Sequence, residues 1–314
     1  MYTISLDPHC HLLPGPALHG VAGARWDATA GKLVIDGHAI GMPSLYSPEA
    51  LIKWLDQNHI KNAWVSAPPP LYRAGLDPST AAVWNDAVHN GLCELISPYA
   101  DRLAVMRLLP IEHPALAAEI VRASPLQDKL FTLSAGEAGL LISGADWEPL
   151  WEVLDGRGAT VLMHPGEGGD TRLAPYYLGN LLGNPVETSI AVAHLVFSGV
   201  VARRPAIRWL LAHAGGATAM LAARWQQGYS TSRPGVDLSQ EQPLVALKRF
   251  TVDWITHSPE GLTLAAAVFG KDKVIYGSDW PFPMGTLDPQ AMLSQLSATE
   301  VSQLLDNTDS FSAG

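Results

Sequence analysis

The chain is poor in cysteine and has few positive charges. Cys10 and Cys93 are the only cysteines among its 314 residues, so neither a disulfide framework nor a Cys-x-x-Cys metal site can form. Lysine and arginine number 20 against 30 aspartate and glutamate residues, and no basic stripe is present. Nucleic acid and an anionic membrane surface are therefore not expected as partners.

Long apolar runs are also absent. No stretch is long enough for a transmembrane helix. The chain begins Met1-Tyr2-Thr3-Ile4, without a basic segment followed by an apolar one, so no signal peptide is expected. With 47% hydrophobic residues, a chain of 314 residues can bury a sizeable core, as one large or two medium domains.

What the sequence does contain is an alternation of strand-like and helix-like segments, about eight of each. The strand-like segments are unbroken apolar runs, which is typical of a parallel sheet buried on both faces. We expect a TIM (β/α)8 barrel in a single domain, 1–314, with a small insert at about 12–47. A doubly wound open sheet is the alternative, but the Gly-x-Gly-x-x-Gly turn it would need after the first strand is missing. Strands are predicted at residues 4–11, 63–67, 103–109, 139–142, 160–164, 207–212, 250–255 and 273–276.

His9 and His11 end the first predicted strand. Residues two apart on a strand point to the same side, so the two imidazoles project together and Cys10 points the other way. Two neutral imidazoles at one spot suit a divalent metal such as zinc, although two solvated histidines near a terminus would show the same pattern. A thiol beside metal ligands would be at risk in an oxidising compartment, so a cytoplasmic location fits better.

Three further groups stand where other predicted strands end, namely His164, His213 and Asp279. In a TIM barrel the C-terminal strand ends form one rim, where active sites lie. Each residue alone could be structural, but five such groups on one rim are hard to explain in that way. Zinc sites in enzymes use a few nitrogen and oxygen ligands and keep one position open, and the same ligands accept manganese or iron. No lysine stands at a strand end to bridge two metals, so a single ion is expected.

Four stretches of sequence carry a family resemblance. They are Asp7-Pro8-His9-Cys10-His11, Met163-His164-Pro165, the segment 185–216 that ends Ala212-His213-Ala214-Gly215-Gly216, and the segment 270–283 that contains Gly277-Ser278-Asp279-Trp280-Pro281. With them the chain resembles the amidohydrolase superfamily over nearly its whole length. Within that superfamily it looks like the aminocarboxymuconate-semialdehyde decarboxylase-like family, also called amidohydrolase family 2.

The resemblance implies roles for individual residues. One metal ion, typically zinc, would be bound by His9, His11, His164 and Asp279. His213 would not be a ligand but the acid or base beside the metal. Arg224 would help to bind a substrate carboxylate across a homodimer interface, which suits a bidentate and permanently charged group. An ordinary exposed helix arginine is the alternative for Arg224.

Two other residues are candidate substrate contacts because of where they stand. Trp280 follows Asp279, and its ring would suit an aromatic or unsaturated substrate at the pocket wall. His257 follows the seventh predicted strand and could line the pocket or be an ordinary loop histidine.

The sequence also departs from the family pattern. In segment 37–44, Ala39 stands near the place of a second substrate-binding arginine, and Asn180 stands about where the family has a tryptophan. Arg25 and Arg172 are candidates for supplying the missing charge. The departures leave the expected metal site intact and put the family's name-giving substrate in doubt.

The expected function is metal-dependent, non-oxidative decarboxylation of a small unsaturated or aromatic carboxylic acid. A hydrolase of a lactone or amide that uses the same mononuclear site is the alternative, because fold and metal site do not determine the chemistry. A non-catalytic metal-binding barrel is a third reading, against which the complete set of strand-end ligands argues. The expected cofactor is one divalent ion, Zn2+ or Mn2+, and the expected partners are a small-molecule carboxylate and a second copy of the chain.

Overall fold

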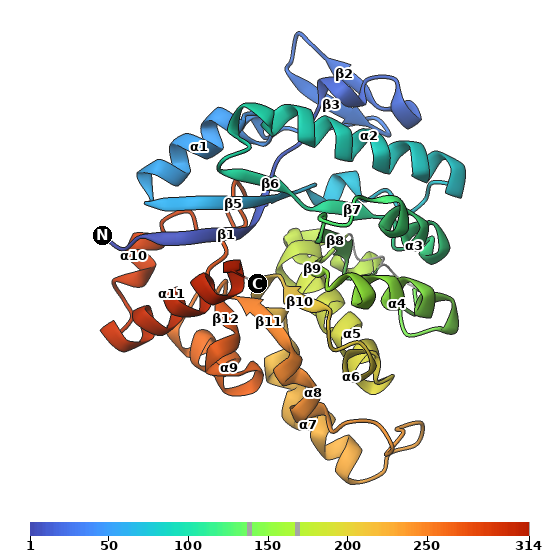
Figure 1. The fold of residues 1–314 in the computed structure, drawn as a ribbon, viewed down its shortest axis with the longest axis vertical. Helices are drawn as coiled ribbons and strands as arrows, with labels where there is room; N and C mark the ends of the chain where they lie inside the picture. Colours follow the sequence, from blue (N-terminus) through green and yellow to red (C-terminus); the bar gives the residue numbers. More distant parts are fainter. Residues whose placement is uncertain (137–139, 167–169, 314) are drawn as a thin grey trace. The chain divides into compact units, whose positions relative to one another are not determined.

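The computed structural model describes residues 1–136, 140–166 and 170–313, which form two compact units. Unit 1 contains Met1–Pro110 and Tyr276–Gly314, and unit 2 contains Ile111–Ile275. In both units, parallel strands are joined by helices (Figure 1). The single domain predicted for residues 1–314 stays a prediction. Among the described residues, no helix combines the length and the apolar character needed to cross a membrane.

Unit 1 is built on a parallel sheet in the order β1-β5-β6. In this sheet β1 (Ile4–His11) pairs with β5 (Ile60–Ser66), and β5 pairs with β6 (Leu103–Val105). The register sets His11 beside Ser66, so the last residue of β1 lies next to the last residue of β5. The remaining strand and C-terminal helices of the unit are β7 (Arg107–Leu109), α10 (Pro289–Leu293) and α11 (Ala298–Ala313).

Two helices connect the strands of this sheet, α1 (Pro48–Gln57) and α2 (Pro78–Ile96). Helix α1 begins at Pro48 because the Ser47 hydroxyl accepts a hydrogen bond from the Ala50 amide at 3.0 Å. Asp77 caps α2 in the same way through two amides of its first turn. Capping residues that are explicit in the sequence therefore set where both helices begin.

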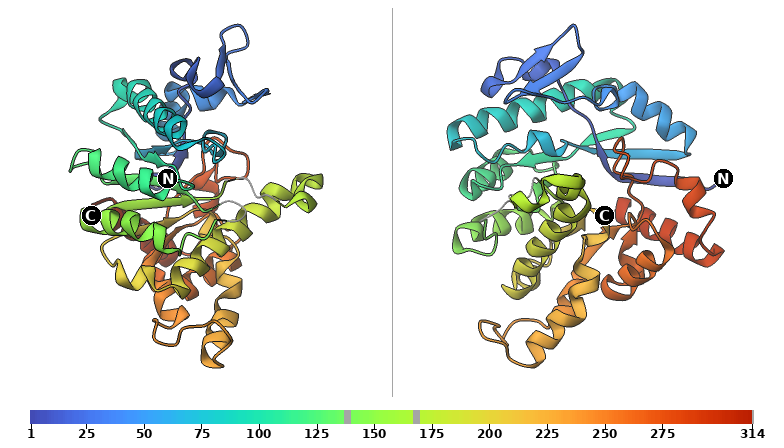
Figure 2. Two further views of the ribbon diagram at one scale, coloured as in Figure 1. Left: turned by 90° about the vertical axis from the view of Figure 1, so that its right-hand side faces the viewer. Right: turned by 180° about the vertical axis from the view of Figure 1, so that it is seen from behind.

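The insert after β1 is a small antiparallel sheet of β2 (Arg25–Asp27), β3 (Lys32–Ile35) and β4 (His38–Ala39). Tyr46 holds it together, because its hydroxyl accepts from the Leu33 amide and donates to the Ile40 carbonyl. The turns that precede β2 pack against α2, and Figures 1 and 2 show the insert beside that helix. Arg73 also holds the insert in place by donating a hydrogen bond to the Ala22 carbonyl at 2.7 Å. The predicted insert after strand 1 is thus present.

Unit 2 contains a longer parallel sheet, in which the order β12-β11-β10-β9-β8 follows the chain one strand at a time. Its strands are β8 (Leu130–Ser134), β9 (Thr160–His164), β10 (Arg208–Leu211), β11 (Phe250–Asp253) and β12 (Val274–Ile275). Its helices are α3 (Pro114–Ala123), α4 (Glu148–Arg157), α5 (Asn184–Phe197), α6 (Val200–Arg203), α7 (Thr218–Ser230), α8 (Pro243–Ala246) and α9 (Pro259–Phe269). Each strand after β8 thus follows a helical connection, as parallel pairing requires.

One predicted strand is wrong. The sequence indicated a strand at 139–142, but the strand is β8, and residues 140–142 belong to an irregular segment and a turn, while Gly139 lies outside the described residues. The Leu141 side chain is 63% exposed, and its carbonyl accepts a hydrogen bond from the Gly144 amide. Residues 140–142 therefore lie outside the sheet, although Ile142 is buried, whereas the more mixed β8 pairs with β9.

Aromatic rings fill the layer between the sheet and α4 in unit 2. Trp151 of α4 lies between Trp147 and Trp209, with ring centroids 5.9 and 5.5 Å away, and Trp209 contacts Phe250 of β11 at 6.0 Å. Trp151 is fully buried, and its indole donates to the Ile142 carbonyl at 3.2 Å. This stack joins α4 to two adjacent strands.

We expect Trp151→Ala to lower the free energy of unfolding by about 3–5 kcal/mol, because it removes a buried ring from the centre of the stack. Urea unfolding followed by tryptophan fluorescence and circular dichroism measures the change. Leu126→Ala is the matched control, since Leu126 is 83% exposed, and it should change stability by less than about 0.5 kcal/mol. Equal stability of the two variants would contradict the role of the stack.

Candidate metal centre

At the end of β1, two imidazole rings approach the same carboxylate. The Nε2 atoms of His9 and His11 lie 3.3 and 3.1 Å from the same oxygen, Oδ1 of Asp279. The two histidines are fully buried, and Asp279 is 4% exposed. Cys10 faces the other way, with its thiol 3.3 Å from the Trp64 carbonyl. The alternation expected from the sequence therefore holds.

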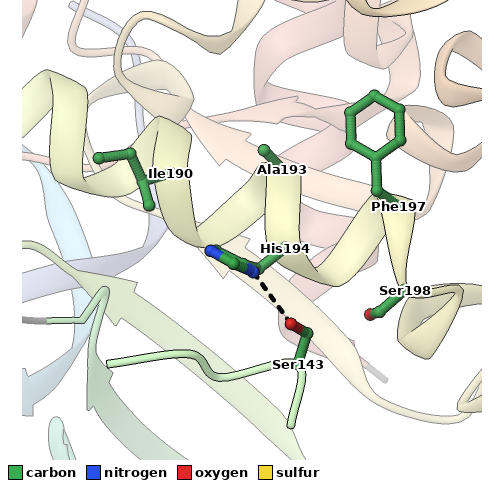
Figure 3. A pocket seen from close by; sticks show the side chains of 6 residues that line it. All are labelled: Ser143, Ile190, Ala193, His194, Phe197 and Ser198. Atoms are coloured by element: carbon green, nitrogen blue, oxygen red, sulfur yellow. Dashed lines mark hydrogen bonds between the residues drawn. The ribbon is translucent and has the colours of Figure 1, made fainter. Parts of the chain in front are cut away.

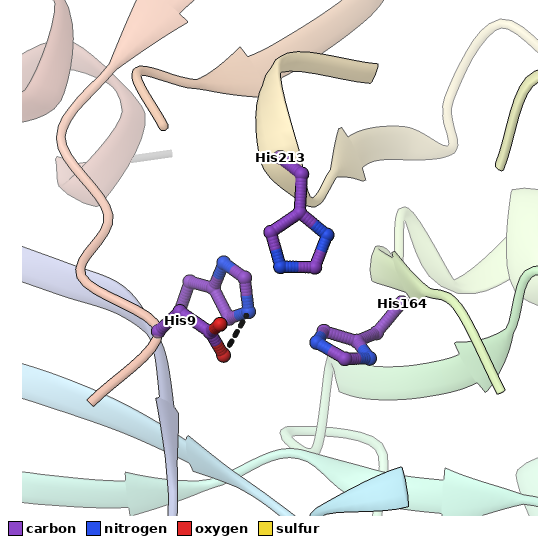
Figure 4. Close-up of side chains that lie close together, drawn as sticks. His9, His164 and His213 are labelled. Carbon is purple, nitrogen blue, oxygen red and sulfur yellow. Dashed lines mark ion pairs between the residues drawn. The ribbon is translucent and has the colours of Figure 1, made fainter. Parts of the chain in front are cut away.

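The close approach of these two nitrogen atoms to one oxygen atom fits a bound cation. If hydrogen bonds alone held the two imidazole nitrogens to one oxygen, each nitrogen would need its own proton. A divalent cation bound by all three atoms would need none, and imidazole nitrogen with carboxylate oxygen is a set that zinc and manganese accept. The dashed line in Figure 4 marks the His9–Asp279 pair.

Asp279 comes to this position because the chain after β12 runs beside β1 before it turns. Its amide donates to the His9 carbonyl at 2.7 Å, and Cys10 and Trp280 form a parallel bridge. The chain then folds back closely, since a Cβ atom on Gly285 would lie 2.1 Å from the Ser278 carbonyl oxygen. A glycine is needed there for the backbone to pass.

Behind the ligands, the buried carboxylate of Asp7 ties these two segments together. It accepts hydrogen bonds from the amides of His9 and Ser278, both at 3.1 Å, and from the Ser278 hydroxyl. Burial raises the pKa of Asp7 to about 6, although the bonds from Ser278 and His9 lower it. Asp7 belongs to the motif recognised in the sequence, but its supporting role was not predicted.

Unit 2 contains two candidate site histidines that lie side by side. His164 ends β9 and is 3% exposed, and its ring centroid lies 5.1 Å from that of His213, which follows β10 (Figure 4). The candidate ligand atoms of the pair lie within 4.8 Å of one another. Strands β9 and β10 are neighbours in the sheet, so their C-terminal ends bring the two rings together.

Hydrogen bonds donated by Nδ1 orient the rings of two candidate ligands. Nδ1 of His164 lies 2.9 Å from the Pro165 carbonyl oxygen, which can only accept, so this nitrogen carries the proton. Nδ1 of His11 lies 3.0 Å from the Ser66 hydroxyl, which in turn donates to the Cys10 carbonyl. In both rings Nε2 is then the atom that can coordinate a metal.

The three predicted substrate contacts differ in their exposure to solvent. Arg224 lies on α7 with an exposed side chain and has no ion-pair partner within the described part of the chain. His257 is exposed and follows β11. Trp280 is 5% exposed, and its ring lies 6.3 Å from that of Trp54 on α1. The roles assigned to these residues stay predictions.

Two other findings bear on the surroundings of the ligands. Phe282, which was not predicted, packs edge-on to His11 at 5.4 Å. The signal was an aromatic residue shortly after the aspartate motif, but only the turn of the chain shows where it points.

Of the candidates for the missing charge, Arg25 pairs with Asp27 and Arg172 with Asp170, with side chains 59% and 87% exposed.

A separate surface pocket of about 420 Å³ lies along α5 in unit 2 (Figure 3). In this pocket Nδ1 of His194 and the Ser143 hydroxyl form a hydrogen bond of 2.9 Å. The pocket contains no predicted site residue. It is lined by Ser143, Ile190, Ala193, His194, Phe197 and Ser198.

Comparisons with known proteins identify the family. The amidohydrolase family model matches residues 6–305, so the chain belongs to the amidohydrolase family. Among curated proteins, 2-amino-3-carboxymuconate-6-semialdehyde decarboxylase of Dictyostelium discoideum is 25% identical over 310 residues, which cover 94% of this chain and 86% of that protein.

Solved structures share the fold of the chain. The structure of 5-carboxyvanillate decarboxylase from Sphingomonas paucimobilis superposes with a TM-score of 0.81 over 98% of both chains, at 15% identity. A dihydroxybenzoic acid decarboxylase from Polaromonas sp. JS666, solved with manganese and 2-nitroresorcinol, gives a TM-score of 0.78 at 17% identity and covers 99% of this chain and 96% of its own. The predicted TIM-barrel fold is confirmed.

We expect Asp7→Ala to lower the free energy of unfolding by about 3 kcal/mol, because a buried hydroxyl and two buried amides lose their acceptor. Denaturant unfolding of the metal-free protein measures this without a contribution from bound metal. Asp101→Ala provides the control in an exposed turn of the same unit and should be close to neutral. A stability of Asp7→Ala equal to that of the control would refute the supporting role of Asp7.

Proposed function

We propose that the chain is a metal-dependent, non-oxidative decarboxylase of a small aromatic or unsaturated carboxylic acid. The observation that carries the proposal is the approach of two buried imidazole nitrogens to one oxygen of Asp279. The family assignment supports it, and so do relatives whose names identify them as decarboxylases.

We assign a single divalent ion to four ligands, namely His9, His11, His164 and Asp279. The ring hydrogen bonds of His11 and His164 support this assignment, because they leave Nε2 as the coordinating atom. Such an ion would supply Lewis-acid charge that attracts the carboxylate and oxygen substituents of a substrate. Zinc is our first choice from the ligand types, and manganese is the choice that the Polaromonas structure favours.

His213 is assigned the acid/base role. Decarboxylation breaks the bond between a carbon and its carboxylate, so carbon dioxide leaves and the electron pair stays on the carbon. That carbon must then take up a proton, and an imidazole can accept and deliver one near neutral pH. Its half-exposed ring beside His164 supports this assignment, since a proton carrier needs a path to solvent.

For the substrate we retain the predicted contacts and add one. Arg224 would bind a carboxylate across a homodimer interface, and its exposed position on α7 supports that proposal. Trp280 and His257 remain candidates for lining the pocket. Phe282 has more direct support than Trp280, because its ring contacts His11. An aromatic or conjugated acid would suit such a surface.

A reducing compartment such as the cytoplasm is also proposed. Both cysteines are free thiols, and Cys10 is buried on the opposite side of the strand from His9 and His11, the two assigned ligands that flank it in the sequence. Oxidation of this thiol to a larger, polar group would disturb the strand that carries them.

The purified protein, loaded with zinc or manganese, should release carbon dioxide from an aromatic acid such as a dihydroxybenzoate or 5-carboxyvanillate. Chelator should abolish the release, and adding back each metal in turn should show which one restores it. The assay also separates the hydrolase alternative, because lactone or amide cleavage consumes substrate without loss of carbon. Hydrolysis with no carbon dioxide from any acid would overturn the proposal.

Two alanine variants should separate ligand from acid/base group. His164→Ala should lose bound metal, as measured by elemental analysis after gel filtration. His213→Ala should keep its metal and lose about 10²–10⁴-fold in kcat, the usual contribution of a general acid or base. Full activity of His213→Ala would refute its role, and full metal content of His164→Ala would refute the assigned coordination.

A further inference from the structure

The structure assigns a positioning role to a buried acid that the proposed mechanism does not use. We propose that Asp253, the last residue of β11, holds the backbone of His213 in the conformation that aims its ring. The inference rests on the proposed function only in naming His213 as the acid/base group. The hydrogen bonds themselves belong to unit 2 and stand apart from any reaction.

The contacts are specific to the backbone of one turn. The Asp253 carboxylate is fully buried, and its Oδ2 atom accepts from the His213 amide at 2.8 Å. The Oδ1 atom accepts from the Ala214 amide at 2.8 Å and from the Ile255 amide at 3.0 Å. Both oxygens are therefore occupied by amides, and two consecutive amides of the turn point at one carboxylate.

The turn needs such support because its backbone is left-handed at residues with side chains. His213 and Ala214 both have φ of 53°, a region that L-residues rarely adopt. Consecutive amides in such a turn form a concavity that attracts an anion. Asp253 supplies that anion from the neighbouring strand, because β10 and β11 pair with Leu211 beside Val252.

The other half of the turn is held differently. Gly216 passes so close to the start of α5 that a Cβ atom there would lie 2.3 Å from the Pro185 carbonyl oxygen. The next amide, that of Ala217, donates to the same carbonyl at 3.1 Å. The glycine side of the turn is thus fixed by packing against α5, while the histidine side is held by the carboxylate.

Asp253 consequently acts through the main chain and is a positioning residue rather than a catalytic one. The direction of the His213 ring follows from its backbone, so a shift of the turn would move the ring relative to its neighbour His164. Misplacement of a reacting group lowers the rate of the chemical step more than it lowers binding. Loss of Asp253 should therefore appear in kcat rather than in KM.

The test is Asp253→Asn, which keeps the shape but replaces one acceptor oxygen with an NH2 group. A single amide oxygen cannot serve both His213 and Ala214 from their present directions. We expect kcat to fall by at least about tenfold and KM to change by less than about threefold, with the metal content unchanged. Asp237→Asn is the matched control, since Asp237 also accepts a backbone amide, from Ser239, but in an exposed loop of the same unit.

A second measurement does not depend on activity. Diethylpyrocarbonate modifies accessible imidazoles, and peptide mass spectrometry gives the modification rate at each histidine. The rate at His213 should change in Asp253→Asn while the rate at the exposed His38 stays constant. Hydrogen exchange of the wild-type protein provides a third readout that needs no variant, because the amides of His213 and Ala214 should be protected.

The outcomes are distinguishable. A folded Asp253→Asn protein with wild-type kcat and wild-type His213 reactivity would overturn the positioning role, as would rapid exchange of the two amides in the wild type. A fall in kcat together with a changed His213 rate would establish it. If the wild type releases no carbon dioxide but the His213 rate still responds to Asp253→Asn, the decarboxylase proposal fails and the positioning of His213 stands.

Discussion

The hydrogen bonds that buried carboxylates accept from backbone amides are the constraint on which the candidate centre depends. Strands that end at a site cannot continue their ladder, so their last amides need other acceptors. In unit 1 the acceptor is Asp7, which binds amides of His9 and Ser278. In unit 2 it is Asp253, which binds amides of His213 and Ala214. Neither acid is an assigned ligand, yet both determine where the functional side chains begin.

Burying these two carboxylates has an energetic cost. A carboxylate without water around it is unfavourable unless hydrogen bonds replace its hydration. At Asp7 the loss of hydration prevails, because its pKa is raised to about 6 despite the bonds from Ser278 and His9. An apolar residue would avoid that penalty but would leave the amides at the strand ends without acceptors. A buried acid at such a place is therefore better explained by the backbone it binds than by acid chemistry of its own.

The sequence allowed the ligand types and their strand-end positions to be predicted, because they follow from local rules. Alternation along β1 was sufficient to place His9 and His11 on one side and Cys10 on the other. The strand expected at 139–142 was wrong because strand formation also depends on non-local pairing. A run such as Leu140-Leu141-Ile142 is apolar enough for a strand, but a strand also needs a sheet neighbour to pair with, and β8 has that neighbour in β9. The roles of Asp7 and Asp253 depend on contacts between different strands, which a single sequence does not display.

The turn of the chain after β12 decides which of two aromatic rings lies beside the candidate ligands. Trp280 bridges to Cys10 of β1, but the backbone bends just before it, because Asp279 has a left-handed φ of 58°. The Asp279 carboxylate is directed at His9 and His11, whereas the Trp280 ring packs against Trp54 of α1. The chain then turns, with the Phe282 amide donating to the Asp279 carbonyl at 2.9 Å, and this turn returns an aromatic ring to His11. The turn after the aspartate motif, rather than the motif itself, therefore determines which ring an aromatic substrate would meet.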